Sequence, residues 1–193
     1  MRLSDVDQLF TPTAVAVFGA SDREDSVGGT VYRNLLASGF KGACYAVNPK
    51  HDQVNGGPCY ESLEALDKRV DLALIATPPE QALAVLEQCG SYGVKAAVIY
   101  SAGFAEQGEA GAVLQERLVE SAHRHRIRML GPNSMGTMRP QHGLNATFSG
   151  GQALRGNVAL VSQSGAVCAA MLDWSVTRHL GFSACLLYTS PSP

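Results

Sequence analysis

The sequence predicts an α/β fold built on a parallel β-sheet with helices on both faces. Short, nearly continuous apolar runs recur along the chain, and stretches with helical periodicity separate them. Such runs are typical of strands that are buried on both faces, and right-handed crossovers between them give a doubly wound, Rossmann-like sheet. The expected strands are residues 14–18, 43–47, 70–76, 96–100 and 127–130.

The stretches between these runs have the spacing of amphipathic helices. In residues 80–90, Ala82, Val85 and Leu86 recur at i, i+3 and i+4, and Gly90 follows as a terminator. Ser62 is a plausible N-cap for a short turn. The expected helices are residues 29–38, 62–66, 80–90 and 109–125.

The last third of the chain predicts a second α/β unit. Residues 131–156 are rich in Gly, Pro, Asn and Ser, and we interpret them as a connection between domains. A strand over 157–161, a polar turn and a helix over 166–176 then repeat the opening pattern, as in a flavodoxin-like domain. The expected organisation is a first domain over 1–135, a linker over 136–152 and the truncated start of a second domain over 153–184.

Composition excludes several classes of protein. The net charge of −2 gives no basic field for nucleic acid. The five cysteines are widely spaced and form no CxxC pair, so we expect no metal site and no disulfide framework. The sequence has no signal peptide and no apolar run long enough to span a membrane, which predicts a cytoplasmic location without a membrane partner.

The first strand leads into a candidate anion site. Residues 14–18 run into Gly19, Ala20 and Ser21, and Gly28–Gly29 opens a helix after a short polar loop. Backbone N–H groups and the helix dipole at such a junction bind phosphate. The GxGxxG pattern of dinucleotide sites is absent, however.

The end of the second strand helps to choose the ligand. An NAD site places Asp or Glu there for the ribose hydroxyl, whereas this chain has Asn48-Pro49-Lys50. A lysine suits a phosphate, which favours NADP or coenzyme A, both of which carry an extra ribose phosphate. The alternative is that Lys50 is an ordinary solvated surface lysine.

Small residues follow the next two strands, at Thr77-Pro78-Pro79 and at Ser101-Ala102-Gly103. The carboxyl ends of parallel strands are where ligands bind, and small residues let a ligand lie against the backbone. The alternative is ordinary loop chemistry, with Pro starting a helix and Gly ending a turn.

Six segments in order carry a resemblance to a known family: VAVFGAS (15–21), VNPKH (47–51), ATPP (76–79), YSAGFAE (100–106), LGPNSMG (130–136) and VSQSGAV (161–167). The sequence resembles the NDP-forming acyl-CoA synthetases, the superfamily of the succinyl-CoA synthetase α-subunit, over residues 5–183. LNATFSG (144–150) and LDW (172–174) look closest to bacterial proteins that join an acetate–CoA ligase-like region to a protein lysine acetyltransferase.

The resemblance implies two binding sites. The implied coenzyme A or acetyl-CoA site consists of Gly19, Ala20, Ser21, Lys50, Thr77, Pro78, Ser101, Ala102, Gly103 and Asn133. Ser162, Ser164 and Gly165 match the helix start that faces a phosphate on the family's catalytic histidine. That histidine and the ATP-grasp region that uses ATP or ADP with Mg lie beyond this sequence, so we expect no catalytic residue here and no ligase activity from this chain alone.

Three functions remain open at this stage, besides a distant NADP oxidoreductase. The first is the CoA-binding part of an ADP- or NDP-forming acyl-CoA ligase. The second is an acetyl-CoA-sensing region of a protein lysine acetyltransferase, which would bring a protein substrate as partner. The third is a stand-alone CoA-binding protein.

Residues 185–193 resemble translated sequencing-adapter read-through, and we interpret them as a non-native tail.

Overall fold

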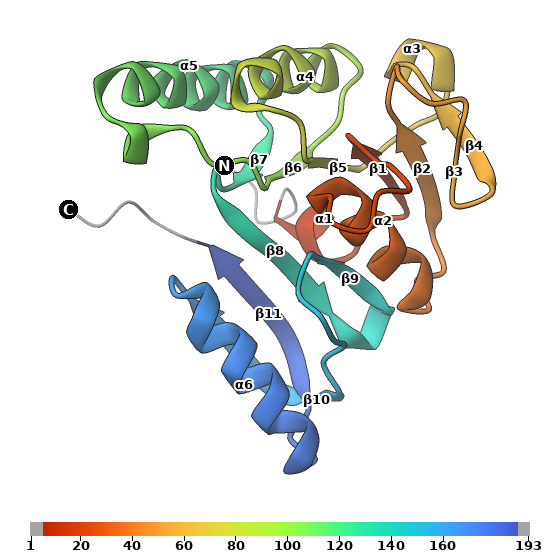
Figure 1. The fold of residues 1–193 in the computed structure, drawn as a ribbon, viewed down its shortest axis with the longest axis vertical. Helices are drawn as coiled ribbons and strands as arrows, with labels where there is room; N and C mark the ends of the chain where they lie inside the picture. The colour runs from red at the N-terminus through yellow and green to blue at the C-terminus, as the bar shows by residue number, and fades with distance from the viewer. Residues whose placement is uncertain (1–5, 189–193) are drawn as a thin grey trace.

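The structure, a computed structural model, describes residues 6–188 and contains two β-sheets (Figure 1). The larger sheet has the strand order β3-β4-β2-β1-β5-β6-β7, and all of its pairs are parallel except β3–β4. This is the predicted doubly wound sheet. Its strands are β1 (Ala14–Phe18), β2 (Ala43–Val47), β3 (Gln53–Val54), β4 (Gly57–Tyr60), β5 (Leu72–Ile75), β6 (Ala96–Ile99) and β7 (Arg128–Leu130).

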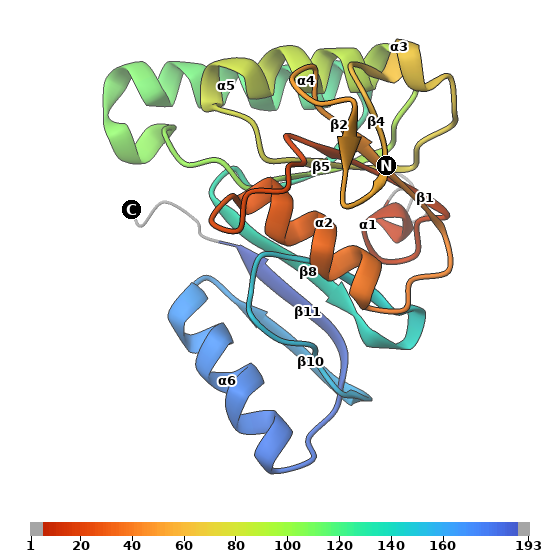
Figure 2. The same ribbon diagram turned by 45° about the vertical axis from the view of Figure 1, so that its right-hand side comes forward.

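Helices cover both faces of the large sheet (Figure 2). One face packs against α3 (Leu63–Leu66), α4 (Pro79–Ser91) and α5 (Glu109–His125), and the other against α1 (Asp7–Phe10) and α2 (Val27–Ala37). Strand β1 shows why its sequence is apolar throughout. Its Ala16 and Phe18 join the core on the α4–α5 side, whereas Val15 and Val17 join the core on the α2 side.

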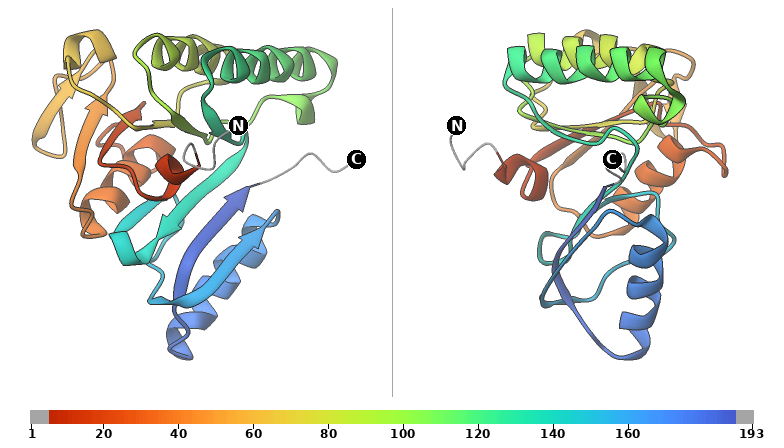
Figure 3. Two further views of the ribbon diagram at one scale, coloured as in Figure 1. Left: turned by 180° about the vertical axis from the view of Figure 1, so that it is seen from behind. Right: turned by 90° about the vertical axis from the view of Figure 1, so that its left-hand side faces the viewer.

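The second sheet has the order β10-β11-β8-β9 and lies on the α2 side of the large sheet (Figure 3). Leu144 and Ala146 of β9 join the same core as Val31 and Leu35 of α2, so α2 is packed between the two sheets. The elements of this layer are β8 (Ser134–Arg139), β9 (Leu144–Thr147), β10 (Arg155–Ser162), α6 (Gly165–Thr177) and β11 (Phe182–Tyr188), and two 3-10 turns lie at Ala105–Gln107 and Pro140–His142.

The connection predicted over 131–156 contains regular structure, contrary to the expectation. Strands β8 and β9 form an antiparallel hairpin there, so residues 136–139 and 144–147 of the stretch predicted as a linker belong to the second sheet. The hairpin was missed because its buried positions include polar residues and glycine. A Cβ at Gly136 would lie 1.9 Å from the Ala146 carbonyl oxygen, so the two strands approach too closely for a larger residue.

Two further expectations about secondary structure need correction. The β3–β4 hairpin was not predicted, because strands this short carry no readable alternation. Residues 185–188, assigned to a non-native tail, pair with β10 and β8 as part of β11. Residues 189–193 of that predicted tail lie outside the described part, and the origin of the tail stays a prediction.

Five large apolar side chains of β10 and α6 are exposed. They are Val158 and Val161 of β10 and Val167, Trp174 and Val176 of α6. The central strands of the large sheet, in contrast, are fully buried. None of the helices within residues 6–188 is long and apolar enough to cross a membrane.

A buried carboxylate ties the start of β1 to the start of β5. Asp71 is 5% exposed, and its Oδ2 accepts hydrogen bonds from the Thr13 N–H (2.9 Å), the Thr13 hydroxyl (2.5 Å) and the Ala14 N–H (3.1 Å). Its Oδ1 accepts from Arg69 Nε at 3.2 Å. Burial raises the pKa of Asp71, but these hydrogen bonds and the Arg69 charge outweigh it and hold the pKa below its ordinary value.

Replacing Asp71 with Asn should therefore destabilise the fold. Asn cannot accept all of these bonds, and we expect Asp71→Asn to lower the free energy of unfolding at pH 7 by about 2 kcal/mol. Because the folded-state pKa is lowered, the wild-type advantage is present above the ordinary Asp pKa and shrinks as the pH falls below about 4. Urea unfolding at pH 7 and pH 3 measures both effects. Asp67→Asn, at an exposed position, is the control, and equal stability of wild type and Asp71→Asn at pH 7 would contradict the prediction.

Candidate functional site

The turn after β1 lies at the centre of the carboxyl edge of the large sheet. Gly19 has a φ of +83°, and a Cβ there would lie 2.7 Å from the Ala76 carbonyl oxygen. Its N–H donates to the Val47 carbonyl at 2.9 Å. Gly28 in the first turn of α2 lies against the other side of this turn, since a Cβ on Gly28 would be 2.1 Å from the Gly19 carbonyl oxygen. Glycine at both positions thus brings the start of α2 directly onto the sheet edge.

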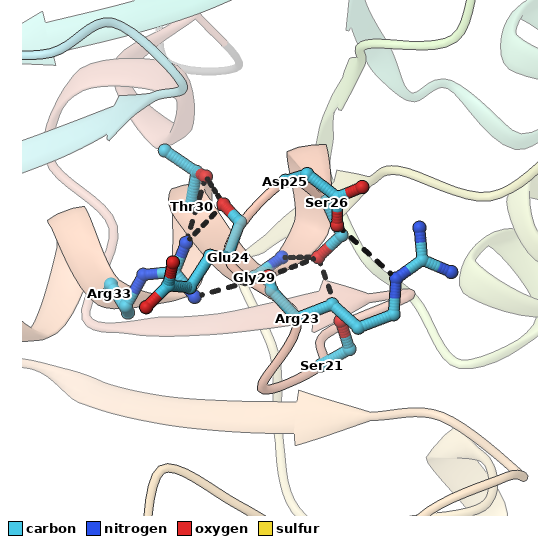
Figure 4. Close-up of polar contacts among 8 residues, drawn as sticks. All are labelled: Ser21, Arg23, Glu24, Asp25, Ser26, Gly29, Thr30 and Arg33. Carbon is cyan, nitrogen blue, oxygen red and sulfur yellow. Dashed lines mark hydrogen bonds and ion pairs between the residues drawn. The ribbon is translucent and has the colours of Figure 1, made fainter.

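Ser26 caps α2 and organises the preceding loop (Figure 4). Its Oγ accepts from the Gly29 N–H at 3.0 Å, donates to the Arg23 carbonyl at 3.1 Å and lies 2.7 Å from the Ser21 Oγ. A hydroxyl has one proton, so with the Ser26 proton on Arg23, the Ser21 hydroxyl is the donor to Ser26. The N–H groups of the first turn ahead of Gly29, those of Val27 and Gly28, have no intrahelical acceptor and are the natural anion donors here.

Asn48 joins the turn after β2 to the turn after β1. Its Nδ2 donates to the Ala20 carbonyl at 2.9 Å, and its Oδ1 accepts from the Lys50 N–H at 3.1 Å. The Lys50 side chain is exposed. The sequence pattern predicted Lys50, but not Asn48, as a site residue. An Asn at the end of a strand, two residues before Lys50, is the signal of an Asx turn that could have identified it.

The ends of β5, β6 and β7 form one continuous row. The Ser101 hydroxyl donates to the Thr77 carbonyl, and the Asn133 N–H donates to the Ser101 carbonyl at 2.9 Å. The Thr77 Oγ1 is buried without a hydrogen-bond partner among the described residues, so it can still bond to a ligand or to an ordered water. Gly103 has a φ of +105°, and a Cβ there would lie 2.8 Å from Pro79 Cγ, so the two loops touch.

Pro78 and Ala102 are exposed in these loops. Glu106 fixes the loop that follows β6, because its Oε1 accepts from the Gly103 N–H at 2.5 Å and the Phe104 N–H at 3.2 Å. Partial burial raises the pKa of Glu106, but these backbone hydrogen bonds outweigh it and lower the pKa below its ordinary value. Glu106 was not among the predicted site residues, although its place at the end of YSAGFAE made it a candidate cap for the loop.

The second predicted site lies where α6 starts. Ser164 is the N-cap, with its Oγ accepting from the Val167 N–H at 3.3 Å, and the Ser162 Oγ accepts from the Ser164 N–H at 3.1 Å. A Cβ on Gly165 would lie 2.3 Å from Met135 Sδ, so the helix start touches β8 two residues after Asn133. Both helix N-termini are therefore connected to the Asn133 turn through packed structure.

The structure brings most of the predicted residues together. Gly19, Ala20, Ser21, Thr77, Ser101, Gly103 and Asn133 form a contiguous row along the carboxyl edge. Lys50 reaches this row through its backbone and Asn48, with its ammonium group in solvent, whereas Ser162, Ser164 and Gly165 form a separate group in the second layer. Among residues 6–188, no cluster of three or more His, Cys, Asp or Glu could hold a metal ion.

This combination of a doubly wound sheet, a glycine turn at its carboxyl edge and a capped helix start defines a Rossmann-like, phosphate-binding class of protein. The CoA-binding domain family matches residues 13–140, and the succinyl-CoA ligase-like flavodoxin domain family matches residues 155–189. The chain belongs to the CoA-binding domain family, within the superfamily of the NDP-forming acyl-CoA synthetases.

Relatives and solved structures agree with this assignment. The chain is similar to an ADP-forming acetate–CoA ligase of Archaeoglobus fulgidus, with 43% identity over 92% of this chain and 26% of that protein. It is 39% identical to the α-subunit of such a ligase from Pyrococcus furiosus, over 93% of this chain and 40% of the subunit. An acetyl-coenzyme A synthetase of Ca. Korarchaeum cryptofilum superposes with a TM-score of 0.91 at 40% identity, over 97% of this chain and 40% of that chain. The chain thus spans about a quarter to two-fifths of these relatives.

The cap at Ser26 gives a direct test of the hydrogen-bond network. We expect Ser26→Ala to lower the free energy of unfolding by about 1 kcal/mol, because the Gly29 N–H loses its acceptor. Ser21→Ala should cost less, because it leaves the bonds from Ser26 to Gly29 and Arg23 in place. Urea unfolding measures both variants, with Ser26→Thr as the conservative control that keeps the cap. A larger loss for Ser21→Ala than for Ser26→Ala would contradict the central position of Ser26 in this network.

Proposed function

We propose that this chain is the CoA-binding part of an ADP-forming acyl-CoA ligase. The observation that carries the proposal is the continuous row from Gly19 through Thr77 and Ser101 to Asn133 along the carboxyl edge of the sheet. A long ligand with phosphates at one end needs such an edge together with an anion site at a helix start. The ligase names of the relatives support the same reading.

In this proposal each part of the row has a physical role toward CoA. The start of α2 takes the diphosphate through backbone N–H groups and the helix dipole. Lys50 takes the ribose phosphate, which is the feature that separates CoA from NAD. The remainder of the ligand lies on a surface of small residues, formed by Thr77, Pro78 and the loop 101–103. Asn133 is at the end of this surface.

The residues present fit such a ligand. The first turn has glycine at the two points where a Cβ would collide with backbone, and the helix above it is capped so that its earliest N–H groups stay open. The Thr77 hydroxyl has no hydrogen-bond partner among the described residues. The chain supplies binding and orientation here, and the thiol chemistry belongs to CoA itself.

The second group, Ser162, Ser164 and Gly165, is proposed to face a phosphorylated histidine of a longer protein. The capped start of α6 suits a phosphate for the same reasons as the start of α2. In this proposal, ATP or ADP with Mg acts at regions outside this sequence, including an ATP-grasp domain. The chain by itself binds CoA or acetyl-CoA and does not complete the ligation.

The other interpretations have no observation in their favour. The relatives described above carry ligase names, so the assignment to a protein lysine acetyltransferase fusion, with a protein as substrate, stays a prediction. A stand-alone CoA-binding protein does not account for β10, α6 and β11, which match a ligase-like domain. A cytoplasmic location is part of the proposal.

Lys50 provides the test of ligand identity. We expect Lys50→Ala to weaken CoA binding by about 1–3 kcal/mol, because a charged hydrogen bond to the ribose phosphate is lost. Binding of dephospho-CoA, which lacks that phosphate, should change much less. Titration calorimetry with both ligands on the full chain measures the difference.

The matched control is Lys41→Ala, an exposed lysine that precedes β2 and so lies at the opposite end of that strand. It should bind both ligands as the wild type does. Equal losses for CoA and dephospho-CoA in Lys50→Ala would remove Lys50 from the phosphate role. A wild-type chain that binds neither ligand would refute the proposed function.

A further inference from the structure

Arg33 lies two turns into α2, and its guanidinium reaches back over the start of the helix (Figure 4). Its Nη2 donates to the Glu24 carbonyl at 2.9 Å and to the Thr30 Oγ1 at 3.0 Å. Its Nη1 donates to the Arg23 carbonyl at 3.3 Å. One planar group therefore joins two successive carbonyls of the loop before α2 to the body of the helix.

The loop over residues 22–25 has few other constraints. The ion pair between Arg23 and Asp25 is exposed, with the side chains 74% and 82% accessible, and such pairs contribute little. Asp22 accepts the Asn55 N–H at 2.7 Å at the far side of the loop. Three side chains link the middle of the loop to α2: the Arg33 guanidinium to both carbonyls, the Ser26 hydroxyl to the Arg23 carbonyl, and the Thr30 hydroxyl to the Glu24 carbonyl at 3.5 Å. Of these, only the Arg33 guanidinium binds both carbonyls.

The Arg23 carbonyl connects Arg33 to the helix cap. It accepts the Arg33 Nη1, the Ser26 N–H at 3.3 Å and the Ser26 hydroxyl. This carbonyl fixes the direction of the Ser26 proton, and so leaves the Ser26 lone pairs to the Gly29 N–H and the Ser21 hydroxyl. A displaced Arg23 carbonyl would disturb all of these bonds at once.

We propose that Arg33 is a positioning residue for phosphate binding at the start of α2, acting through the Arg23 and Glu24 carbonyls rather than by contact with the ligand. The inference rests on the proposed CoA-binding function and deepens it. In this proposal, phosphate recognition depends on the shape of the loop over residues 22–26, because that shape determines whether the N–H groups of Val27 and Gly28 face a phosphate. The bidentate geometry is central, because a lysine has the same charge but cannot hold both carbonyls in a planar fork.

Arg33→Lys therefore separates geometry from charge. In the full chain we expect Arg33→Lys and Arg33→Met to bind CoA about tenfold more weakly than the wild type by calorimetry. Hydrogen exchange of the ligand-free chain should speed up across residues 22–29 in both variants. Thr30→Val, which removes one acceptor of the same guanidinium, should weaken binding less. The control is Arg117→Lys on α5, which lies across the large sheet and should leave affinity and exchange unchanged.

Each outcome decides for or against the proposal. Weaker CoA binding with faster exchange over 22–29 in Arg33→Lys supports it. Wild-type affinity in Arg33→Lys, with loss only in Arg33→Met, assigns the effect to charge and overturns it. A lowered melting temperature with unchanged affinity shows a purely structural role and also overturns it. If the wild-type chain does not bind CoA, both the proposed function and this inference are refuted. If the wild-type chain and the Arg33 variants bind CoA with equal affinity, only this inference is refuted.

Discussion

The contact between Gly28 and the Gly19 carbonyl is the constraint on which the rest of the molecule depends. A Cβ on Gly28 would lie 2.1 Å from that oxygen, so no other residue allows α2 to approach the turn after β1 this closely. The approach places the positive end of the helix dipole over the centre of the sheet edge. It also sets the height of α2 above the large sheet, and therefore the surface on which the second sheet is packed.

The second sheet is attached to two of the elements that form the candidate site, α2 and β6. Asn34 of α2 donates from its Nδ2 to the Thr147 carbonyl at 2.8 Å and to the Ser149 carbonyl at 3.0 Å. Tyr100, directly after β6, donates its buried hydroxyl to the Ala146 carbonyl at 2.8 Å. Strand β9 is thus held from α2 and from the end of β6, and the ladder β9-β8-β11-β10 continues to α6. The two helix starts are connected by packed sheet rather than by a flexible linker.

The sequence predicted the features that follow from apolar periodicity and from glycine. Strands β1 and β2 were predicted with the observed bounds. The turn at Gly19 was predicted because an apolar strand that ends in small residues before a helix start is typical of a phosphate-binding turn. The hairpin of β8 and β9 could not be predicted in this way. Its Thr137, Asn145 and Thr147 are buried, and they satisfy their polar groups through contacts made only in the fold, such as Thr137 Oγ1 with the Cys185 carbonyl at 3.1 Å. Asn48 and Glu106 were not predicted as site residues for a related reason. Each binds backbone groups of loops whose positions are set only by the fold.

The hydrogen-bond network around Ser26 indicates which groups of this site would bind a phosphate. The protons of Ser21 and Ser26 are both engaged inside the protein, so neither hydroxyl is a ready donor to a ligand without breaking an existing bond. The loop before α2 carries three carboxylates, Asp22, Glu24 and Asp25, against two nearby cations, Arg23 and the Arg33 guanidinium, so side-chain charge near the turn does not favour an anion. What does favour one is the main chain: the open N–H groups of the first helical turn, pointing along the dipole and fixed by a satisfied cap. Recognition at the first turn is therefore a property of backbone geometry, and the side chains that matter most are those that hold the backbone rather than those that carry charge to the ligand.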